Sequence, residues 1–124
     1  MEKVLLAKLI QAEQAISEIT YKQLPLDYAE ALLKFIEDAA EHVNQFAEIN
    51  NKMIAEKYGE QKDGVWQIIQ EKIEEYQSEI KPLLEKELDL EVPNMKLSVI
   101  KDANPKFTIS TFALSHLKNF ILYE

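Results

Sequence analysis

The stretch from about Leu26 to Tyr58 constrains the fold most, because its apolar residues recur at alternating three- and four-residue steps. With Ile36 at heptad position a, this pattern predicts one helix with a continuous apolar stripe. Position a holds Ala29, Ile36, Val43, Asn50 and Lys57; position d holds Leu32, Ala39, Phe46 and Met53; position e holds Leu33, Ala40, Ala47 and Ile54. At about 1.5 Å per residue the helix would be roughly 50 Å long, so it must project or pair along its length.

The segments on either side of this helix also have helical spacing. From Glu2 to about Ile19 the apolar residues predict an amphipathic helix, and Pro25 suits the first turn of the long helix that follows. A third helix is predicted from Trp66 to Leu88, with Pro82 kinking it or loosening one turn.

Directly after Leu88 the pattern of apolar residues no longer has helical spacing. LEVPNMKLSVI alternates apolar and polar residues and predicts one or two short strands or an extended segment. DANPK, residues 102–106, is typical of a turn, and Phe107 is predicted to begin another extended piece. Ser110 is then expected to cap a last helix from Thr111 to about Leu122.

The sequence KYGEQKDGVW, residues 57 to 66, holds both glycines of the chain and could be a ligand loop or a turn. A phosphate-binding loop needs a lysine and a hydroxyl after its second glycine, whereas Val65 and Trp66 follow Gly64. A calcium loop needs several spaced acidic ligands, and Asp63 alone does not supply them. We therefore predict a turn, with Gly59 at positive φ capping the long helix, and an antiparallel helix pair.

Composition limits the domain count and the partners. The chain has 124 residues, which predicts a single domain, 1–124, with a helical hairpin at 2–88 and a small extended segment and terminal helix at 89–124. The net charge of −8 and the absence of arginine disfavour direct nucleic-acid binding. No segment has the character of a signal peptide or a membrane span, so we expect a cytoplasmic protein.

Few residues are candidates for chemistry. Asp38 and His42 could share a helix face, but an exposed ion pair is a simpler interpretation than a metal site. Ser115 and His116 are adjacent, so their side chains point about 100° apart and do not form a nucleophile and base pair. We predict no catalytic, cofactor-binding or metal-binding residue, no cofactor and no enzymatic activity.

Carboxylates are concentrated in the predicted third helix. They are Glu71, Glu74, Glu75, Glu79, Glu85 and Glu87. Their alternation with lysines is typical of a solvated helix face. A second interpretation is that this acidic surface imitates the phosphate track of DNA.

Three residues are candidates for protein interaction. Asn50 occupies an a position, where a buried asparagine fixes register or partner number, although the stripe could equally be exposed there. Tyr58 and Trp66 stand at the two ends of the glycine loop. We favour a clasp, in which the two rings pack together and close the hairpin. The alternative is that they form an exposed aromatic binding spot.

The order of segments resembles a family of small phage and prophage proteins of unknown function. The resemblance spans nearly the whole chain through QLPLDYAEALLKFIEDAAEHVNQF, IAEKYGEQKDG with its KYGE-like motif, the acidic helix EKIEEYQSEIKPLLEKE, LEVPNMKLSVI and TISTFALSHLKNFI. Pro82 and Pro93 depart from the family pattern. The resemblance implies a phage origin, a location in the host cytoplasm or in the virion, and no catalytic residue.

These observations predict a mainly α fold: a long antiparallel helical hairpin with an N-terminal helix, a short extended or β segment and a C-terminal helix. Alanines at Ala29, Ala39, Ala40 and Ala47 allow a neighbour to approach closely, so a homo-oligomer is expected. The function we predict is a non-enzymatic phage protein that acts through contacts with a phage or host protein, as a structural or assembly accessory. The alternative is an inhibitor of a host or defence protein.

Overall fold

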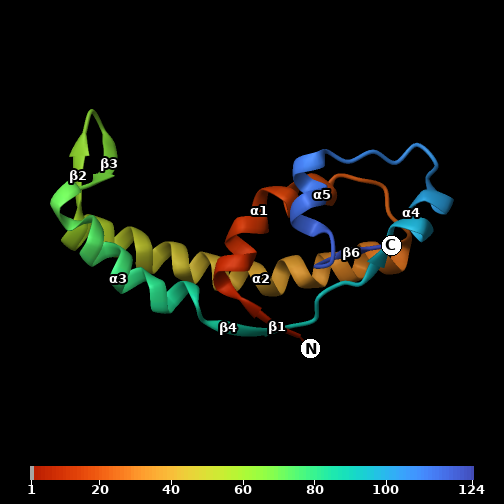
Figure 1. Ribbon diagram of the computed structural model, residues 1–124, viewed down its shortest axis with the longest axis horizontal. Helices are drawn as coiled ribbons and strands as arrows, with labels where there is room; N and C mark the ends of the chain where they lie inside the picture. The colour runs from red at the N-terminus through yellow and green to blue at the C-terminus, as the bar shows by residue number, and fades with distance from the viewer. Residues whose placement is uncertain (1) are drawn as a thin grey trace.

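The predicted long helix forms the axis of the structure (Figure 1). The computed structural model describes residues 2–124, and in it α2 spans Leu26–Met53 and continues directly into the π-helical turn η1, Ile54–Tyr58. Pro25 stands immediately before α2 and its carbonyl accepts the first bond of the helix, from the N–H of Ala29. The sequence prediction of a helix from Leu26 to Tyr58 is therefore confirmed, with its last turn wound more loosely.

The other elements are much shorter. The remaining helices are α1 (Leu6–Thr20), the 3-10 turn η2 (Gln70–Lys72), α3 (Ile73–Leu84), α4 (Leu97–Ala103) and α5 (Thr111–Leu117). The strands of residues 2–124 form three separate pairs: β1 (Glu2–Leu5) antiparallel to β4 (Glu87–Leu90), β2 (Gly59–Lys62) antiparallel to β3 (Val65–Ile68), and β5 (Met95–Lys96) parallel to β6 (Leu122–Tyr123).

The predicted mainly helical architecture is confirmed. Figure 1 shows α3 returning beside the C-terminal half of α2, with β2 and β3 projecting beyond the turn, while α1, α4 and α5 gather around the N-terminal half. The Tyr76 hydroxyl of α3 donates to the side-chain oxygen of Asn50 in α2, which places the two helices side by side. The C-terminal elements lie at the end away from the glycine turn, as predicted.

The main core lies around the N-terminal half of α2. Phe35 is 1% exposed, and its ring meets that of Phe120 edge to face with centroids 6.1 Å apart. Leu9 and Ile19 of α1 and Leu117 of α5 are buried in the same cluster. By contrast, no residue of α3 is buried, so the hairpin end of the molecule has little apolar core of its own.

Several predicted boundaries were wrong because tertiary pairing overrides local pattern. Residues 2–5 form a strand, not helix, since Val4 is buried opposite Leu88 of β4. Residues 65–68 form β3, so the third helix begins at Ile73 rather than Trp66. Pro82 is accommodated within the last turn of α3, which ends at Leu84.

The C-terminal boundaries also differ from the prediction. Of the alternating segment LEVPNMKLSVI, Met95–Lys96 forms the short strand β5, but residues 97–100 begin the helix α4, with Ile100 buried, and this helix extends into the predicted turn as far as Ala103. Ser110 caps α5 as predicted, accepting a bond from the N–H of Ala113. The last helix ends at Leu117 and not at Leu122, because Asn119 adopts a left-handed φ of 62° and the chain turns into β6.

Gly64 lies in the turn as predicted, whereas the role of Gly59 differs from the prediction. Gly59 has an extended φ of −113° and begins β2, so it is not a left-handed cap. A Cβ at this position would lie 2.5 Å from the carbonyl oxygen of Ile54. Asp63 and Gly64 have φ of 53° and 78°, the pattern of the two-residue turn that the dipeptide Asp-Gly favours between antiparallel strands.

Truncation of Phe35 tests the position of the core. Phe35→Ala should lower the free energy of unfolding by about 3–5 kcal/mol, since it leaves a cavity opposite Phe120. Leu33→Ala, two residues away on the same helix, should change it by less than about 1 kcal/mol because Leu33 is 57% exposed. Chemical denaturation of both variants measures the difference, and equal losses would contradict this placement.

Substitution by asparagine distinguishes the two glycines. Gly64→Asn should cost less than about 1 kcal/mol, because asparagine tolerates left-handed backbone. Gly59→Asn should cost about 1–3 kcal/mol, since any Cβ there meets backbone of Ile54. A thermal melt of each variant gives the order, and a mild effect at Gly59 together with a severe effect at Gly64 would refute it.

Candidate functional site

A cluster of polar side chains fixes the turn between α2 and α3. Tyr58 is buried, and its hydroxyl donates to the carboxylate of Glu79 in α3. The ammonium group of Lys57 lies 3.2 Å from the other carboxylate oxygen of Glu79. The ammonium group of Lys72 in η2 donates to the backbone carbonyl of Lys57. These contacts connect η1 with η2 and with the middle of α3.

The charges in this cluster shift two pKa values in opposite directions. The hydrogen bond to Glu79 raises the pKa of Tyr58 to about 12, with burial and the neighbouring carboxylates adding to the effect. The bonds from Tyr58 and Lys57 lower the pKa of Glu79 below its usual value of 4.5. Both shifts favour the same pair of forms, a neutral phenol and a carboxylate.

Asn50 lies on the stripe facing α3, and it is half-buried. Its side-chain oxygen accepts the hydroxyl of Tyr76 at 2.5 Å. The ring of Tyr76 also packs edge to face against Tyr58, with centroids 5.8 Å apart. Asn50 therefore fixes the register of α3 on α2 within one chain, which is an intramolecular version of the role that its heptad position suggests.

Trp66 does not clasp Tyr58, because Tyr58 is turned inward onto Tyr76. Trp66 lies in β3 opposite Gln61 of β2, where its side chain is 47% exposed. Its neighbour Val65 is 58% exposed. The hairpin arm, which we define as residues 59–68, therefore presents apolar side chains to solvent on a short two-stranded ribbon. Because Tyr58 is buried, the two residues do not form an exposed aromatic pair either; of the two, Trp66 alone is exposed, and its role in binding stays a prediction.

A mostly apolar depression lies between α1 and α2. This α1/α2 groove has a volume of about 260 Å³. It is lined by Leu9, Glu13, Ile16, Ser17, Thr20 and Tyr21 from α1 and its end, and by Phe35, Ile36, Ala39, Ala40, Val43 and Asn44 from α2. The hydroxyl of Thr20 already donates to the carbonyl of Ile16, so its donor is satisfied within α1.

Sequence reasoning did not predict this groove, although its signal is present in the heptad pattern. The apolar stripe of α2 includes positions d, a and e, which is wider than one neighbouring helix covers. At position d, Leu32 and Ala39 are buried, whereas at position e, Leu33 and Ala40 are exposed. The exposed side of the stripe forms one wall of the groove and continues past it to Leu33.

The candidate chemical residues lie apart from the groove. Asp38 and His42 border a shallow hollow beside β4, in which the ammonium group of Lys34 binds the carboxylate of Glu91 at 2.8 Å. That pairing lowers the pKa of Glu91 and raises the pKa of Lys34. Within residues 2–124, no group of three or more histidines and acidic residues is arranged to hold a metal ion.

Ser115 and His116 point to different partners, as their adjacency predicts. The Ser115 hydroxyl donates to the carbonyl of Phe112. The His116 ring lies against the ring of Phe112, with centroids 4.6 Å apart. Since Phe112 is 47% exposed, this is a surface contact on α5 rather than a closed site.

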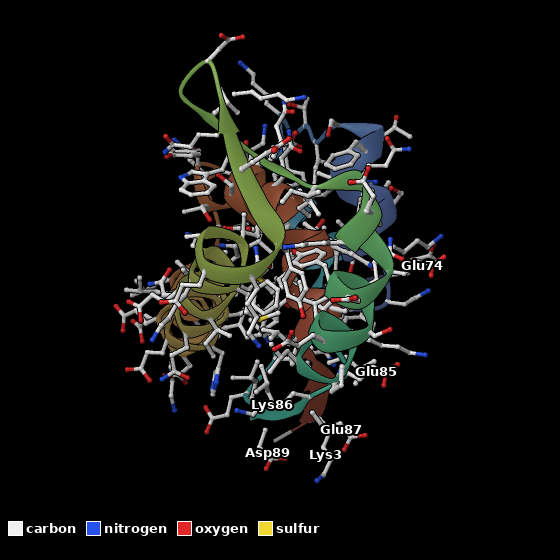
Figure 2. All side chains as sticks on the ribbon, turned by 90° about the vertical axis from the view of Figure 1, so that its left-hand side faces the viewer. Lys3, Glu74, Glu85, Lys86, Glu87 and Asp89 are labelled. Carbon is white, nitrogen blue, oxygen red and sulfur yellow. The ribbon has the colours of Figure 1, made fainter. Side chains whose placement is uncertain are left out.

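Carboxylates and lysines alternate along α3 and β4. Figure 2 shows Lys3 and Lys86 among the side chains of Glu85, Glu87 and Asp89 at the lower end of this face. The ammonium group of Lys3 lies 4.0 Å from a carboxylate oxygen of each of Glu87 and Asp89. This part of the surface is acidic in composition but mixed in charge.

In comparisons with known proteins, no family model, curated protein or solved structure matches the chain. The resemblance to phage proteins therefore stays a prediction. No helix in the part of the chain that the structure describes is long and apolar enough to cross a membrane.

Replacement of Tyr58 tests the polar cluster. The depressed pKa of Glu79 means that its carboxylate stabilises the fold above about pH 4.5 and that this contribution is lost as the pH falls through the folded-state pKa. The raised pKa of Tyr58 means that its contribution is complete below pH 10 and is lost as the pH rises through about 12. Tyr58→Phe should therefore move the pKa of Glu79 upward towards 4.5 and weaken both pH dependences.

The Glu79 shift is measured by NMR titration of its side-chain carboxyl, and stability by thermal melts across the same pH range. Tyr21→Phe is the matched control, since Tyr21 is 86% exposed. An unchanged Glu79 titration in Tyr58→Phe would show that the phenol does not control this carboxylate.

Proposed function

We propose that the chain is a non-enzymatic protein that acts through contacts with other proteins, as a structural or assembly accessory of phage origin. The observation that carries this proposal is the open α1/α2 groove, whose walls include the half-buried Ile16, Ile36 and Val43. Clefts between packed helices are among the places where proteins commonly bind ligands and partner side chains.

The size of the groove supports a protein ligand over a small molecule. Pockets for drug-sized ligands usually have volumes of about 300–1,000 Å³ and enclose most of the ligand. The groove has about 260 Å³ and is open along one side. It has room for one or two side chains from a protein surface, which is how interface anchors are usually buried.

The hairpin arm supports a second contact, through which we propose that the chain forms a homo-oligomer. An isolated two-stranded hairpin is marginally stable in water, and open strand edges are templates for pairing with another chain. In the arm, β2 and β3 pair only with each other, and Trp66 is 47% exposed. Pairing of two arms would cover both the edges and this ring.

Inhibition of a host or defence protein by DNA mimicry is the alternative. The net charge of −8 favours it in general terms. The mixed charge of α3 and β4 supports it less, because a phosphate track is uniformly negative and Lys3 stands between Glu87 and Asp89. We place the protein in the host cytoplasm or the virion, without direct contact to nucleic acid or membrane.

Photo-crosslinking in cells of the native host tests this proposal. With a photoreactive amino acid in place of Ala40 in the groove or Trp66 in the arm, we expect discrete crosslinked species. The same amino acid in place of Ala31, an exposed position of α2 away from the groove, is the matched control. Crosslinks from Ala40 and Trp66 no stronger than those from Ala31 would overturn the proposal.

A further inference from the structure

We infer that the α1/α2 groove binds an amphipathic helix of a partner protein, and that this helix carries lysines or arginines beside its apolar stripe. The inference rests on the proposed function and names the chemistry of the ligand at its site. It follows from three properties of the groove: its helical walls, its small residues and the sign of the charges at its rim.

The walls of the groove favour a helix as its occupant. Residues of α1 and α2 that line it lie within continuous helices, whose backbone N–H and C=O groups are bonded along the helix axis. A strand that entered the groove would therefore find no backbone partners, and its own polar groups would be buried without bonds. A helix satisfies its backbone internally and needs only side-chain complementarity, as in other helix-in-groove complexes.

Small side chains in the groove allow such a helix to approach closely. Ala39 and Ala40 lie between the larger Ile36 and Val43 on the wall formed by α2. Helices pack with their axes about 8–10 Å apart, and the shorter distances need small residues at the contact. Residues spaced three and four apart on the incoming helix could then occupy the hollow above the alanines.

The charged residues at the rim are acidic. Glu13 is the one charged residue among those that line the groove. On α2, Glu37 is exposed and lies one helical turn from both Leu33 and Ala40, on the open side of the stripe. Flanking lysines or arginines on the incoming helix would meet these carboxylates, which would set orientation and speed association.

Lys34, the lysine of α2 nearest to this rim in sequence, does not neutralise it. Its ammonium group is bound to Glu91 at 2.8 Å, on the β4 side of α2. A second copy of this chain would place a like acidic rim against the first, so a symmetric groove-to-groove dimer is disfavoured at low salt. The same charges disfavour an anionic lipid surface.

Two designed peptides provide the test. Both are helical, with the same leucine stripe at positions spaced three and four apart; one has lysines beside the stripe and the other has glutamates. Fluorescence anisotropy at low salt should show that the lysine peptide binds at least about 10-fold more tightly, and that added salt reduces this difference. Ala40→Glu should weaken binding of the lysine peptide by at least about 10-fold, because it fills and charges the wall, whereas Ala31→Glu should not.

Charge reversal at the rim gives the sharpest outcome. Glu13→Lys with Glu37→Lys should reverse the preference, so that the glutamate peptide binds more tightly. Glu71→Lys with Glu74→Lys makes the same change of net charge on exposed residues of η2 and α3, which do not line the groove, and should leave the preference unchanged. Circular dichroism of each variant confirms that the helices remain folded.

Failure of the inference differs from failure of the proposed function. Lack of binding, equal binding of the two peptides, or a preference that does not reverse would overturn the inference. Self-association that Ala40→Glu abolishes would assign the groove to a second copy and would also overturn it. In each case crosslinks from Ala40 in host cells would still support the proposed function, whereas crosslinks from Ala40 and Trp66 no stronger than those from Ala31 would overturn that proposal independently.

Discussion

The structure depends on burying the broad apolar stripe of α2, because a helix of 28 residues cannot be covered by any one of the shorter elements around it. Different neighbouring elements cover different parts of its length. Around Phe35 the stripe is buried by α1 and by Phe120 near the C-terminus, in a continuous core. Around Asn50 it meets α3, whose residues are at most half-buried. The two halves of one helix are thus stabilised in different ways.

Hydrogen bonds replace apolar burial in the second half. Tyr58 and Tyr76 pack together and direct their hydroxyl groups to Glu79 and Asn50 respectively. Such bonds depend on geometry and protonation more than burial of aliphatic side chains does. Because few apolar side chains are buried there, the arm and α3 should open locally at a lower free energy than the main core. A projecting element of this kind can change its packing on meeting a partner without unfolding the rest.

The sequence predicted those features that arise from local pattern over many residues. The period of α2, the cap at Ser110 and the reversal of the chain near Gly64 are all of this kind. Prediction from the sequence failed where contacts between residues far apart in the chain decide the structure. Val4 forms a strand because Leu88 lies opposite, which no local pattern around Val4 could indicate.

The same contrast between local pattern and contacts distant in sequence applies to the candidate site. Asn50 and Tyr58 were predicted as candidates for protein interaction, whereas the folded chain shows that they bind Tyr76 and Glu79 within the molecule. The prediction for residues 57–66 was a turn between two helices, although the dipeptide Asp63-Gly64 is a strong signal for a β-hairpin. With that signal given more weight, β2 and β3 and the exposure of Trp66 could have been predicted.

The groove connects these packing constraints with function. α1 packs more extensively against α5 than against α2, and part of the α2 stripe beside it is uncovered at Ala40. On the opposite side of α2, the pairing of Lys34 with Glu91 holds a positive charge away from that opening. Neither arrangement needs a ligand in order to form, because each follows from contacts within the chain. The folded chain therefore has an apolar hollow with an acidic rim even without a partner. Because folding has already ordered this surface, binding of a helix there costs less conformational entropy.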